Sequence, residues 1–407
     1  MRSMDRFFSK KEIVLGVTGS IAAYKACDLA SRLTQAGARV QAVLTQSALH
    51  LVGAATFEGV TGRRAITQMF EPLQNPDVEH IAVAQRADLF IVAPASANTI
   101  AKAAHGLADD WLSTTLLATR APILFAPAMN TNMYTHPATI ENMARLSARG
   151  CLFVGPDAGR LACGTVGQGR MTDPQTIMEA AISLISGKHE LEGRHIVITS
   201  GGTHEPIDPV RYIGNRSSGK MGRALALEAI SRGAQVTVIT GAHEAGLPHN
   251  VEVVEVQTAK DMAEAVIHLA QEADAFIGAA AVGDFRVDKP MDMKHKRAGE
   301  GITLNLVENP DILSLVSAVK QKQLLTVGFA AETEKLIENA KIKLKKKQLD
   351  FIVANEVGTP QSGFGADTVK AAIIDKKENV DELPLMGKDA LAEIIFDRLC
   401  ALLGAGK

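Results

Sequence analysis

Residues 194–222, RHIVITSGGTHEPIDPVRYIGNRSSGKMG, decide how the second half of the chain folds. The stretch opens with the β-branched run 195–199, which predicts a buried strand. Ser200, Gly201 and Gly202 follow at the carboxyl end of that strand, where glycines let backbone amides approach a ligand closely. A strand that ends in such a turn and leads on to a helix is typical of a doubly wound α/β domain.

The polar loop after this turn, residues 204–216, carries arginines and an asparagine. Ser217 and Ser218 come next, and we expect them to cap a helix that begins near Lys220. Because a helix N-terminus and basic side chains both attract negative charge, the loop predicts an anionic ligand such as a nucleotide or a phosphate ester.

Residues 214–220, GNRSSGK, nearly match the phosphate loop G-x-x-x-x-G-K-[ST]. Met221 stands where that loop needs a hydroxyl for magnesium, and the match lies well past the strand instead of directly on its end. These departures exclude a Walker-type ATPase and leave the weaker inference of phosphate binding. Glycines that only turn the chain are the alternative.

At 407 residues the chain is long enough for two domains of about 100–200 residues each. Its 46% of hydrophobic residues supplies a normal core for each, and its formal net charge of −2 gives no general attraction to nucleic acid or to a membrane. No run approaches the ~20 apolar residues of a membrane span, and residues 1–11 lack the apolar core of a signal peptide. We expect a reduced cytoplasmic protein, because no C-x-x-C pair or metal-binding set occurs among Cys27, Cys151, Cys163 and Cys400.

The first half of the chain also begins as a βαβ unit. The turn Gly19–Ser20 leads from its first strand into a helix that we expect to end near Ala36. We expect Ser20 to cap this helix, and the free amides behind it to accept a phosphate. The turn lacks the third glycine of G-x-G-x-x-G, so a dinucleotide is not indicated. The strands predicted in this half span residues 12–18, 38–45, 88–93 and 123–126.

The last two of these strands end in small polar side chains. After the third strand, PASANT places Ser96 and Thr99 where a second phosphate contact would form. After the fourth, PAMN brings Asn130 and then Met133 to the same edge of the sheet. Ordinary loop chemistry explains either stretch alone, but both at strand ends favour a ligand site.

Residues 159–171, GRLACGTVGQGRM, predict a flexible flap that closes over a substrate. The flap carries Cys163, for which spacing alone leaves a catalytic and a structural role equally open. His80 precedes a short apolar helix over 81–87, where a lone histidine is more often structural than catalytic.

A predicted helix over 174–186 closes the first half, and the polar connector 187–193 follows it. We therefore expect two domains, 1–189 and 190–407. Strands and helices alternate again in the second half, which predicts a second doubly wound sheet. Its predicted strands span residues 195–199, 235–240, 251–256, 273–278 and 324–327.

Several motifs follow strands of the second half. Residues 279–286, AAAVGDFR, put one carboxylate after a run of small side chains, and 294–297, KHKR, form a dense basic patch. NPDI at 309–312 begins a helix that its own Asn or Asp would cap. GFAAET at 328–333 follows the last predicted strand.

The helix after that strand carries five lysines between residues 341 and 347. A lysine run is usually a solvated face, but Lys343 and Lys347 are four residues apart and share one side of the helix. Two lysines on the side that meets the carboxyl edge of the sheet would bind a triphosphate. A DNA-binding surface would need a more basic chain, and the near-neutral net charge argues against it.

Taken in order, these motifs resemble those of the bacterial bifunctional coenzyme A biosynthesis proteins over essentially the whole chain. That family joins a phosphopantothenoylcysteine decarboxylase to a phosphopantothenate–cysteine ligase. In the first half the likeness rests on GSIAAYK, PASANT, PAMNxxM and LACG; in the second it rests on DPVRYIxNxSSGKMG, AAVxDFR, NPDI, GFAAET and KLxxKxxD. No catalytic position of the family is missing, and residues 201–204, GGTH, are a small variation of its usual loop.

The resemblance implies two Rossmann-like domains: a flavodoxin-like, FMN-dependent cysteine decarboxylase and a CTP-dependent ligase. It implies that His80 lies beside the flavin, that Asn130 holds the substrate carboxylate, and that Cys163 donates a proton from the flap. The residues it implies for FMN are Gly19, Ser20, Thr45, Ser96, Thr99 and Met133.

In the ligase half, the resemblance implies that Asn215 positions an acyl-cytidylate. It also implies that Lys294 stabilises charge on phosphate together with Mg²⁺, for which Asp284 is the candidate ligand. The residues implied for the CTP site are Gly278, Ala279, Ala280, Asp284, Lys294, Asn309, Pro310, Asp311, Ile312, Phe329, Lys343 and Lys347.

The partners implied are phosphopantothenate, cysteine and CTP, in a homo-oligomer of decarboxylase trimers and ligase dimers, with a dodecamer as one arrangement. Two other functions stay open. One is a flavin-dependent decarboxylase of another cysteine-containing substrate with a degenerate second domain, which CTP- and cysteine-dependent pyrophosphate release would exclude. The other is a flavin-binding regulatory subunit without catalysis, which release of CO₂ would exclude.

Overall fold

A computed structural model describes residues 4–69, 79–162, 164–242, 246–294, 302–319, 324–332, 334–356 and 365–404. Contacts within the chain divide it into two compact units, Met1–Gly187 and Lys188–Lys407. Each unit is an α/β fold with a mainly parallel sheet, as the sequence predicts. No helix within the described ranges is long and apolar enough to cross a membrane.

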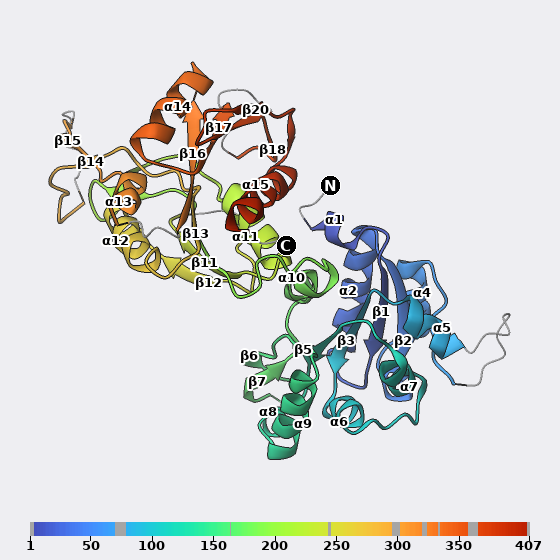
Figure 1. The fold of residues 1–407 in the computed structure, drawn as a ribbon. Coiled ribbons are helices and arrows are strands. Elements are labelled where there is room, and N and C mark those ends of the chain that lie inside the picture. The colour runs from blue at the N-terminus through green and yellow to red at the C-terminus, as the bar shows by residue number, and fades with distance from the viewer. Residues whose placement is uncertain are drawn as a thin grey trace. The chain divides into compact units, whose positions relative to one another are not determined.

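The first unit is built on a five-stranded parallel sheet in the order β2-β1-β3-β4-β5 (Figure 1). In this flavodoxin-like order the chain moves to opposite sides of β1, and sheets of this order commonly bind ligands in a crevice outside the carboxyl ends of the strands that flank this point, here β1 and β3. The strands are β1 (Glu12–Val17), β2 (Arg39–Leu44), β3 (Leu89–Ala95), β4 (Ile123–Pro127) and β5 (Leu152–Phe153).

Apolar side chains of the strands and of the helices that cover them form the core of the first unit. One cluster joins Phe90 and Phe125 of the sheet to Trp111 and Leu112 at the start of α7. The antiparallel hairpin of β6 (Asp157–Arg160) and β7 (Val166–Arg170) contains most of the glycine-rich flap. The helices are α1 (Asp5–Phe8), α2 (Ala23–Gln35), α3 (Gln46–Leu49), α4 (Ala54–Thr61), α5 (Glu79–Arg86), α6 (Ala97–His105), α7 (Trp111–Ala118), α8 (Thr131–Tyr134), α9 (Pro137–Ala148) and α10 (Pro174–Ile185).

The second unit is built on an eight-stranded sheet in the order β12-β11-β8-β13-β16-β17-β19-β20. The strands from β12 to β17 are parallel, while β19 and β20 add an antiparallel edge. The chain moves to opposite sides of β8, so the crevice of this sheet lies at the carboxyl ends of β8 and β13. The strands are β8 (His195–Ser200), β11 (Gln235–Thr240), β12 (Glu252–Glu255), β13 (Ala275–Gly278), β16 (Leu325–Glu332), β17 (Phe351–Glu356), β19 (Ala371–Asp375) and β20 (Val380–Glu382).

Alternating side chains of β8 divide the core of the second unit between the two faces of the sheet. Ile196 and Ile198 pack with Phe396 of α15 and with side chains of α11. Val197 points to the opposite face and packs with Met262 of α12 and with α13. The helices are α11 (Lys220–Ser231), α12 (Ala259–Leu269), α13 (Ile312–Val319), α14 (Leu336–Lys346) and α15 (Lys388–Leu403). Short strand pairs join β9 (His204–Pro206) to β10 (Tyr212–Gly214), β14 (Phe285–Val287) to β15 (Leu306–Glu308), and β18 (Thr368–Val369) to β21 (Met386–Gly387).

Two of the predicted helix caps are wrong. α2 begins at Ala23, and its N-cap is Ala22 without a side-chain bond, because Ser20 lies in the turn before it. α11 begins at Lys220 as predicted, but neither Ser217 nor Ser218 caps it. The N-cap position belongs to Gly219, whose φ of 73° is in the left-handed region that favours glycine.

The end of β16 also differs from the prediction. GFAAE was expected to follow the strand, but β16 continues through it to Glu332. β16 continues because β17 pairs with it from Val327, opposite Phe351, as far as Glu332, opposite Glu356. Similarly, the flap expected as a glycine-rich loop is largely paired as the β6–β7 hairpin.

Arg232 joins α11 to α15 through a buried ion cluster that the sequence pattern does not reveal. Its side chain is 2% exposed, with Nε 2.7 Å from Glu228 Oε1 and Nη2 2.5 Å from Asp397 Oδ1. Burial alone would lower the pKa of the Arg232 guanidinium, but the bonds to Asp397 and Glu228 outweigh it and raise that pKa. The fully buried carboxylate of Glu228 also lies 3.6 Å from Lys188 Nζ, which is farther than its 2.7 Å from Arg232 Nε.

We expect Arg232→Leu to lower the free energy of unfolding of the second unit by about 3–5 kcal/mol, because it leaves the buried carboxylate of Glu228 poorly compensated. Hydrogen exchange of the α11 and α15 amides in the full chain at increasing urea measures the change. The exposed pair Lys260–Glu264 in α12 supplies the control, since Lys260→Leu should cost less than about 1 kcal/mol. Equal costs for the two variants would contradict the assignment.

Candidate functional site

The first unit brings its predicted phosphate-binding loops together at the carboxyl ends of β1 and β3. Thr18, directly after β1, is 1% exposed. Its hydroxyl donates to the carbonyl of Pro94 at 2.7 Å and accepts from the backbone N–H of Ser96 at 3.0 Å. The loop that contains Gly19 and Ser20 is therefore tied to the PASANT loop. Sequence reasoning did not single out Thr18, although its place at the end of a strand was a signal.

Hydroxyl side chains line this edge at helix N-termini. Ser96 is the N-cap of α6, and its Oγ accepts from the Thr99 N–H at 3.3 Å and lies 3.1 Å from the Thr99 hydroxyl. Thr99 is only 5% exposed. Thr45 is the N-cap of α3 and accepts from the Ala48 N–H at 3.3 Å. Because β1, β2 and β3 are parallel neighbours, the loops of Ser20, Thr45 and Ser96 share one edge of the sheet.

The β6–β7 hairpin rests on the loop that carries Asn130. The carbonyl of Gly169 accepts from the Met129 N–H at 3.0 Å, and the Thr131 hydroxyl donates to the Gln168 carbonyl at 2.7 Å. Asn130 lies between these two bonds and is the N-cap of α8, where its Oδ1 accepts from the Asn132 N–H at 2.9 Å. The hairpin and the predicted carboxylate-binding side chain are therefore held together.

The remaining residues predicted for the decarboxylase are Met133, His80 and Cys163. Met133 of α8 is 49% exposed, and His80 is half-buried in the first turn of α5. Cys163 lies outside the described residues. Its neighbours Leu161 and Thr165 close the hairpin through a backbone bond of 2.8 Å.

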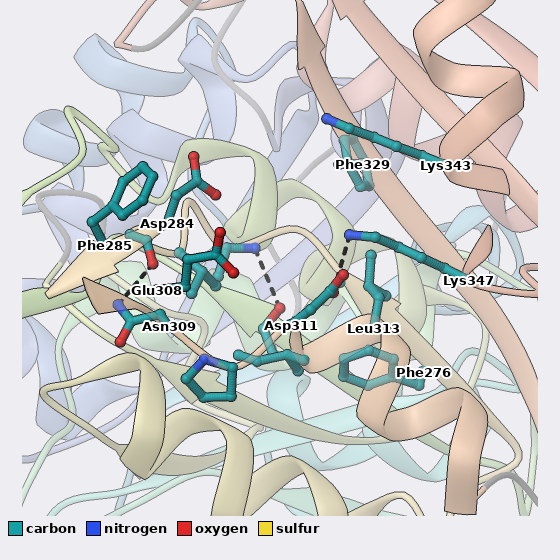
Figure 2. Close-up of a pocket in the computed structure, with 17 residues that line it drawn as sticks. Phe276, Asp284, Phe285, Glu308, Asn309, Asp311, Leu313, Phe329, Lys343 and Lys347 are labelled. Carbon is teal, nitrogen blue, oxygen red and sulfur yellow. Dashed lines mark hydrogen bonds and ion pairs between the residues drawn. The ribbon is translucent and has the colours of Figure 1, made fainter. Parts of the chain in front are cut away.

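In the second unit, a cavity of about 470 Å³ opens at the carboxyl edge of the sheet (Figure 2). Side chains from β13, the loop after it, the start of α13, β16 and α14 surround this first cavity. Ten residues of the predicted CTP site line it, namely Gly278, Ala280, Asp284, Asn309, Pro310, Asp311, Ile312, Phe329, Lys343 and Lys347. Sequence reasoning missed others that line it, including Phe276, Phe285 and Glu308.

Lysines and carboxylates face one another in the first cavity. Both Lys343 of α14 and Lys347, the C-cap residue of α14, point into it, as their spacing predicts (Figure 2). Lys343 Nζ is 2.6 Å from Glu332 Oε1, and Lys347 Nζ is 3.0 Å from Asp311 Oδ1. Burial would raise the pKa of the Asp311 carboxyl, but the bond and charge of Lys347 and two bonds from Ser314 lower it below its ordinary value.

A second cavity of about 360 Å³ shares a wall with the first. Asn215 lines it and donates through Nδ2 to the Val282 carbonyl at 2.9 Å. Ala279 and the start of α11, with Ser217 and Ser218, also line this second cavity. The residues that line both cavities are Ala280, Val282, Asp284, Phe329 and Lys343.

Two predicted ligase roles are not brought together with the rest. Lys294 is exposed and lines neither cavity, and the residues that follow it, 295–301, lie outside the described ranges. Within the described residues, no group of three or more His, Cys, Asp or Glu side chains could hold a metal ion. Among the described residues that line both cavities, Asp284 is the one with an acidic side chain.

The chain is similar to known proteins over nearly its whole length. Residues 1–186 match the Flavoprotein family, and residues 191–403 match the family described as DNA/pantothenate metabolism flavoprotein C-terminal domain. The Coenzyme A biosynthesis bifunctional protein CoaBC of Bacillus subtilis (strain 168) is 45% identical over 398 residues, 97% of this chain and 98% of that protein. The protein of the same description from Escherichia coli (strain K12) is 42% identical over 392 residues, 96% of each chain. A crystal structure of the C-terminal domain of such a protein matches 53% of this chain and 99% of its own, with 35% identity and a TM-score of 0.46.

Proposed function

The chain belongs to the family of bifunctional coenzyme A biosynthesis proteins, and from this membership we propose how its two units divide the family's ligase and decarboxylase activities. Residues 1–189 carry an FMN-dependent phosphopantothenoylcysteine decarboxylase. Residues 190–407 carry a CTP-dependent phosphopantothenate–cysteine ligase. Because the similarity to a bifunctional relative extends over 97% of the chain, it disfavours both a degenerate second half and a flavin-binding subunit without catalysis.

The shared wall of the two ligase cavities carries this assignment. Activation of a carboxylate by a nucleotide needs two substrates side by side, with the carboxylate next to the α-phosphate. Volumes of about 470 and 360 Å³ lie within the usual range for small-molecule sites. We place CTP in the first cavity, with its triphosphate on Lys343 and Lys347, and phosphopantothenate in the second.

The ligase reaction then follows in two steps. The phosphopantothenate carboxylate attacks the α-phosphate of CTP at the shared wall, forming an acyl-cytidylate and releasing pyrophosphate. The amine of cysteine attacks the acyl carbon, forms the amide and releases CMP. Asn215, held by the Val282 carbonyl at the second cavity, positions the acyl-cytidylate through its side-chain oxygen.

We further propose that Asp284 and the phosphate oxygens of CTP hold Mg²⁺. Magnesium in nucleotide sites is commonly bound by one or two carboxylates and by phosphates, with water completing the shell. A single carboxylate in the shared wall fits this pattern. Bound there, the metal would neutralise charge on the phosphates. Lys294 is the proposed second cation for the α-phosphate.

For the first unit we propose FMN as the ligand of the crevice between β1 and β3. The hydroxyls of Ser20, Thr45 and Ser96, together with the N-terminus of α6, suit a phosphate monoester. Thr99 acts by holding the Ser96 hydroxyl, because its own hydroxyl is buried against it. Gly19 keeps the turn close to α3, since a Cβ there would lie 2.5 Å from Ser47 Cβ. When bound, the flavin supplies a reversible two-electron oxidation of the substrate thiol, which makes loss of CO₂ possible.

The chain's own residues orient that reaction. Asn130 binds the carboxylate that leaves as CO₂, Met133 contacts the flavin, and His80 lies beside it. Cys163 donates the proton that completes the saturated thiol product. A homo-oligomer of decarboxylase trimers and ligase dimers is part of the proposal, and exposed apolar side chains such as Ile21 and Tyr24, 62% and 64% exposed, suit subunit contacts in the first unit.

Purified full-length protein tests both assignments at once. We expect flavin absorbance, pyrophosphate release that needs CTP and phosphopantothenate and continues beyond one turnover only with cysteine, and subsequent release of CO₂. A colourless preparation that FMN does not reconstitute would contradict the decarboxylase assignment. Pyrophosphate release at the same rate with and without cysteine and phosphopantothenate would contradict the ligase assignment.

A further inference from the structure

Two helices of the second unit begin with a lysine at the same cavity. Lys220 is the first residue of α11 and Lys388 is the first residue of α15, and both line the second cavity. Neither helix has a side-chain cap. A cation at a helix N-terminus is unfavourable, because the helix dipole is positive there. Here the sequence places an unfavourable cation at two helix N-termini beside one cavity. Such departures from local preference are expected at functional sites.

The two lysines differ in their partners. Lys220 Nζ is 2.6 Å from Asp367 Oδ1 and donates to the Gly365 carbonyl at 2.8 Å. The ammonium of Lys388 has no ion pair or hydrogen bond with any residue in the described ranges. Its backbone N–H, by contrast, is fixed by the Asp367 carbonyl at 3.2 Å. Burial, and next the charge of Lys220, lower the pKa of the Lys388 amine.

An acidic residue close to these lysines, Asp367, pairs with Lys220, and its charge partly offsets the lowering of the Lys388 pKa, but it does not line the second cavity. Among the described residues, Asp284 is the single carboxylate that lines this cavity, and it belongs to the wall shared with the first. Asn355, Gly365 and Val369 also line this cavity, and Gly365 bonds to Lys220. A half-buried, unpaired ammonium in such surroundings is stabilised by an anionic ligand.

We infer that Lys388 binds the phosphate monoester of the acyl substrate and makes the ligase selective for the phosphorylated form. The inference rests on the proposed ligase function. In that function the substrate carboxylate must lie at the shared wall, beside CTP. The opposite end of the molecule, which carries the phosphate, therefore extends away from that wall toward Lys220 and Lys388. The phosphate would compensate the charge that α15 places at its own N-terminus.

Steady-state kinetics of Lys388→Gln in the full-length protein test the inference. We expect the KM for phosphopantothenate to rise about 10- to 100-fold, the size of one lost charge-assisted hydrogen bond, with the KM values for CTP and cysteine unchanged. The preference for phosphopantothenate over pantothenate should fall by the same factor. Lys388→Arg should restore most of both. Lys370→Gln is the matched control, because Lys370 pairs with Glu356 at 2.9 Å and lines neither cavity.

An unchanged KM for phosphopantothenate, or a rise confined to the KM for CTP, would overturn the inference. Wild-type protein without any cysteine-dependent pyrophosphate release would instead contradict the ligase function itself, so the two failures are distinguishable. If Lys388→Gln does not fold, labelling of wild-type lysines with acetic anhydride gives the answer. Phosphopantothenate should protect Lys388, and not Lys370, when the labelled peptides are measured by mass spectrometry; equal labelling of Lys388 with and without it would also overturn the inference.

Discussion

Replacing Lys343 and Lys347 together with methionine is expected to lower kcat/KM for CTP about 10²- to 10⁴-fold, while decarboxylation keeps its rate. Each lysine would supply a charge-assisted hydrogen bond to the triphosphate worth about 1.5–3 kcal/mol. Two such losses amount to about 3–6 kcal/mol, and each 1.36 kcal/mol is about a factor of ten in rate. Methionine keeps the length of the side chain without its charge, so the change isolates the electrostatic contribution.

The carboxylates that remain should strengthen this effect. Without nucleotide, Glu332 and Asp311 neutralise Lys343 and Lys347 at 2.6 and 3.0 Å. In the double variant both carboxylates would face the triphosphate without the lysines that neutralise them. Two negative charges would then repel the substrate, so we expect most of the loss as a higher KM for CTP. Titration of the variant with CTP, followed by pyrophosphate release, measures it.

The same helix supplies a matched control. Lys341 and Lys345 lie four residues apart on α14 as well, but both pair with Glu378 and line neither cavity. Lys341→Met with Lys345→Met removes the same charge from the same helix, and it should change kcat/KM for CTP less than about threefold, as exposed pairs contribute little. A loss as large as that of the first pair would mean that net charge alone matters, and would contradict the proposed triphosphate site.

The sequence predicts the ligase cavity well because its parts follow local rules. Residues that come directly after parallel strands meet at one edge of the sheet, so the ends of β8 and β13 could be expected to lie together. Helical spacing alone indicates that Lys343 and Lys347 share a side. The ligand class is implied by the family resemblance, because neither rule supplies it. Ten of the residues predicted for the CTP site do line the first cavity together.

What could not be predicted depends on contacts between distant segments. Lys388 reaches the second cavity only because α15 packs beside α11, more than 150 residues earlier in the chain, as the Arg232 bond to Asp397 illustrates with a separation of 165. No periodicity or motif indicates such a pairing. The same holds for Gly169, whose closest neighbour is the loop of Met129. Wrong caps at Ser20 and Ser217 show a further limit, since a serine near a helix start can cap the helix but does not always do so.

Gly169→Ala is expected to slow decarboxylation at least about 10²-fold and to leave CTP-dependent ligation unchanged. A Cβ on Gly169 would lie 2.1 Å from the carbonyl oxygen of Met129, and its φ of 143° disfavours any side chain. That oxygen belongs to the backbone and cannot turn away. The hairpin must therefore lift from the Asn130 loop, which breaks the bond from the Met129 N–H to Gly169. Misplacement of a positioning group by about 1 Å is enough to cost 10²-fold in rate.

Flavin content separates this effect from general unfolding. The loops of Ser20 and Ser96 are joined through Thr18, independently of the hairpin, so Gly169→Ala should keep its flavin absorbance while CO₂ release falls. Gly53→Ala is the control, because Gly53 has a φ of −82° and no atom within 4 Å of an added Cβ. It should retain both flavin and activity. Normal CO₂ release from Gly169→Ala would show that the hairpin does not position the reacting groups, and loss of flavin along with activity would show that the hairpin supports the cofactor crevice rather than the substrate.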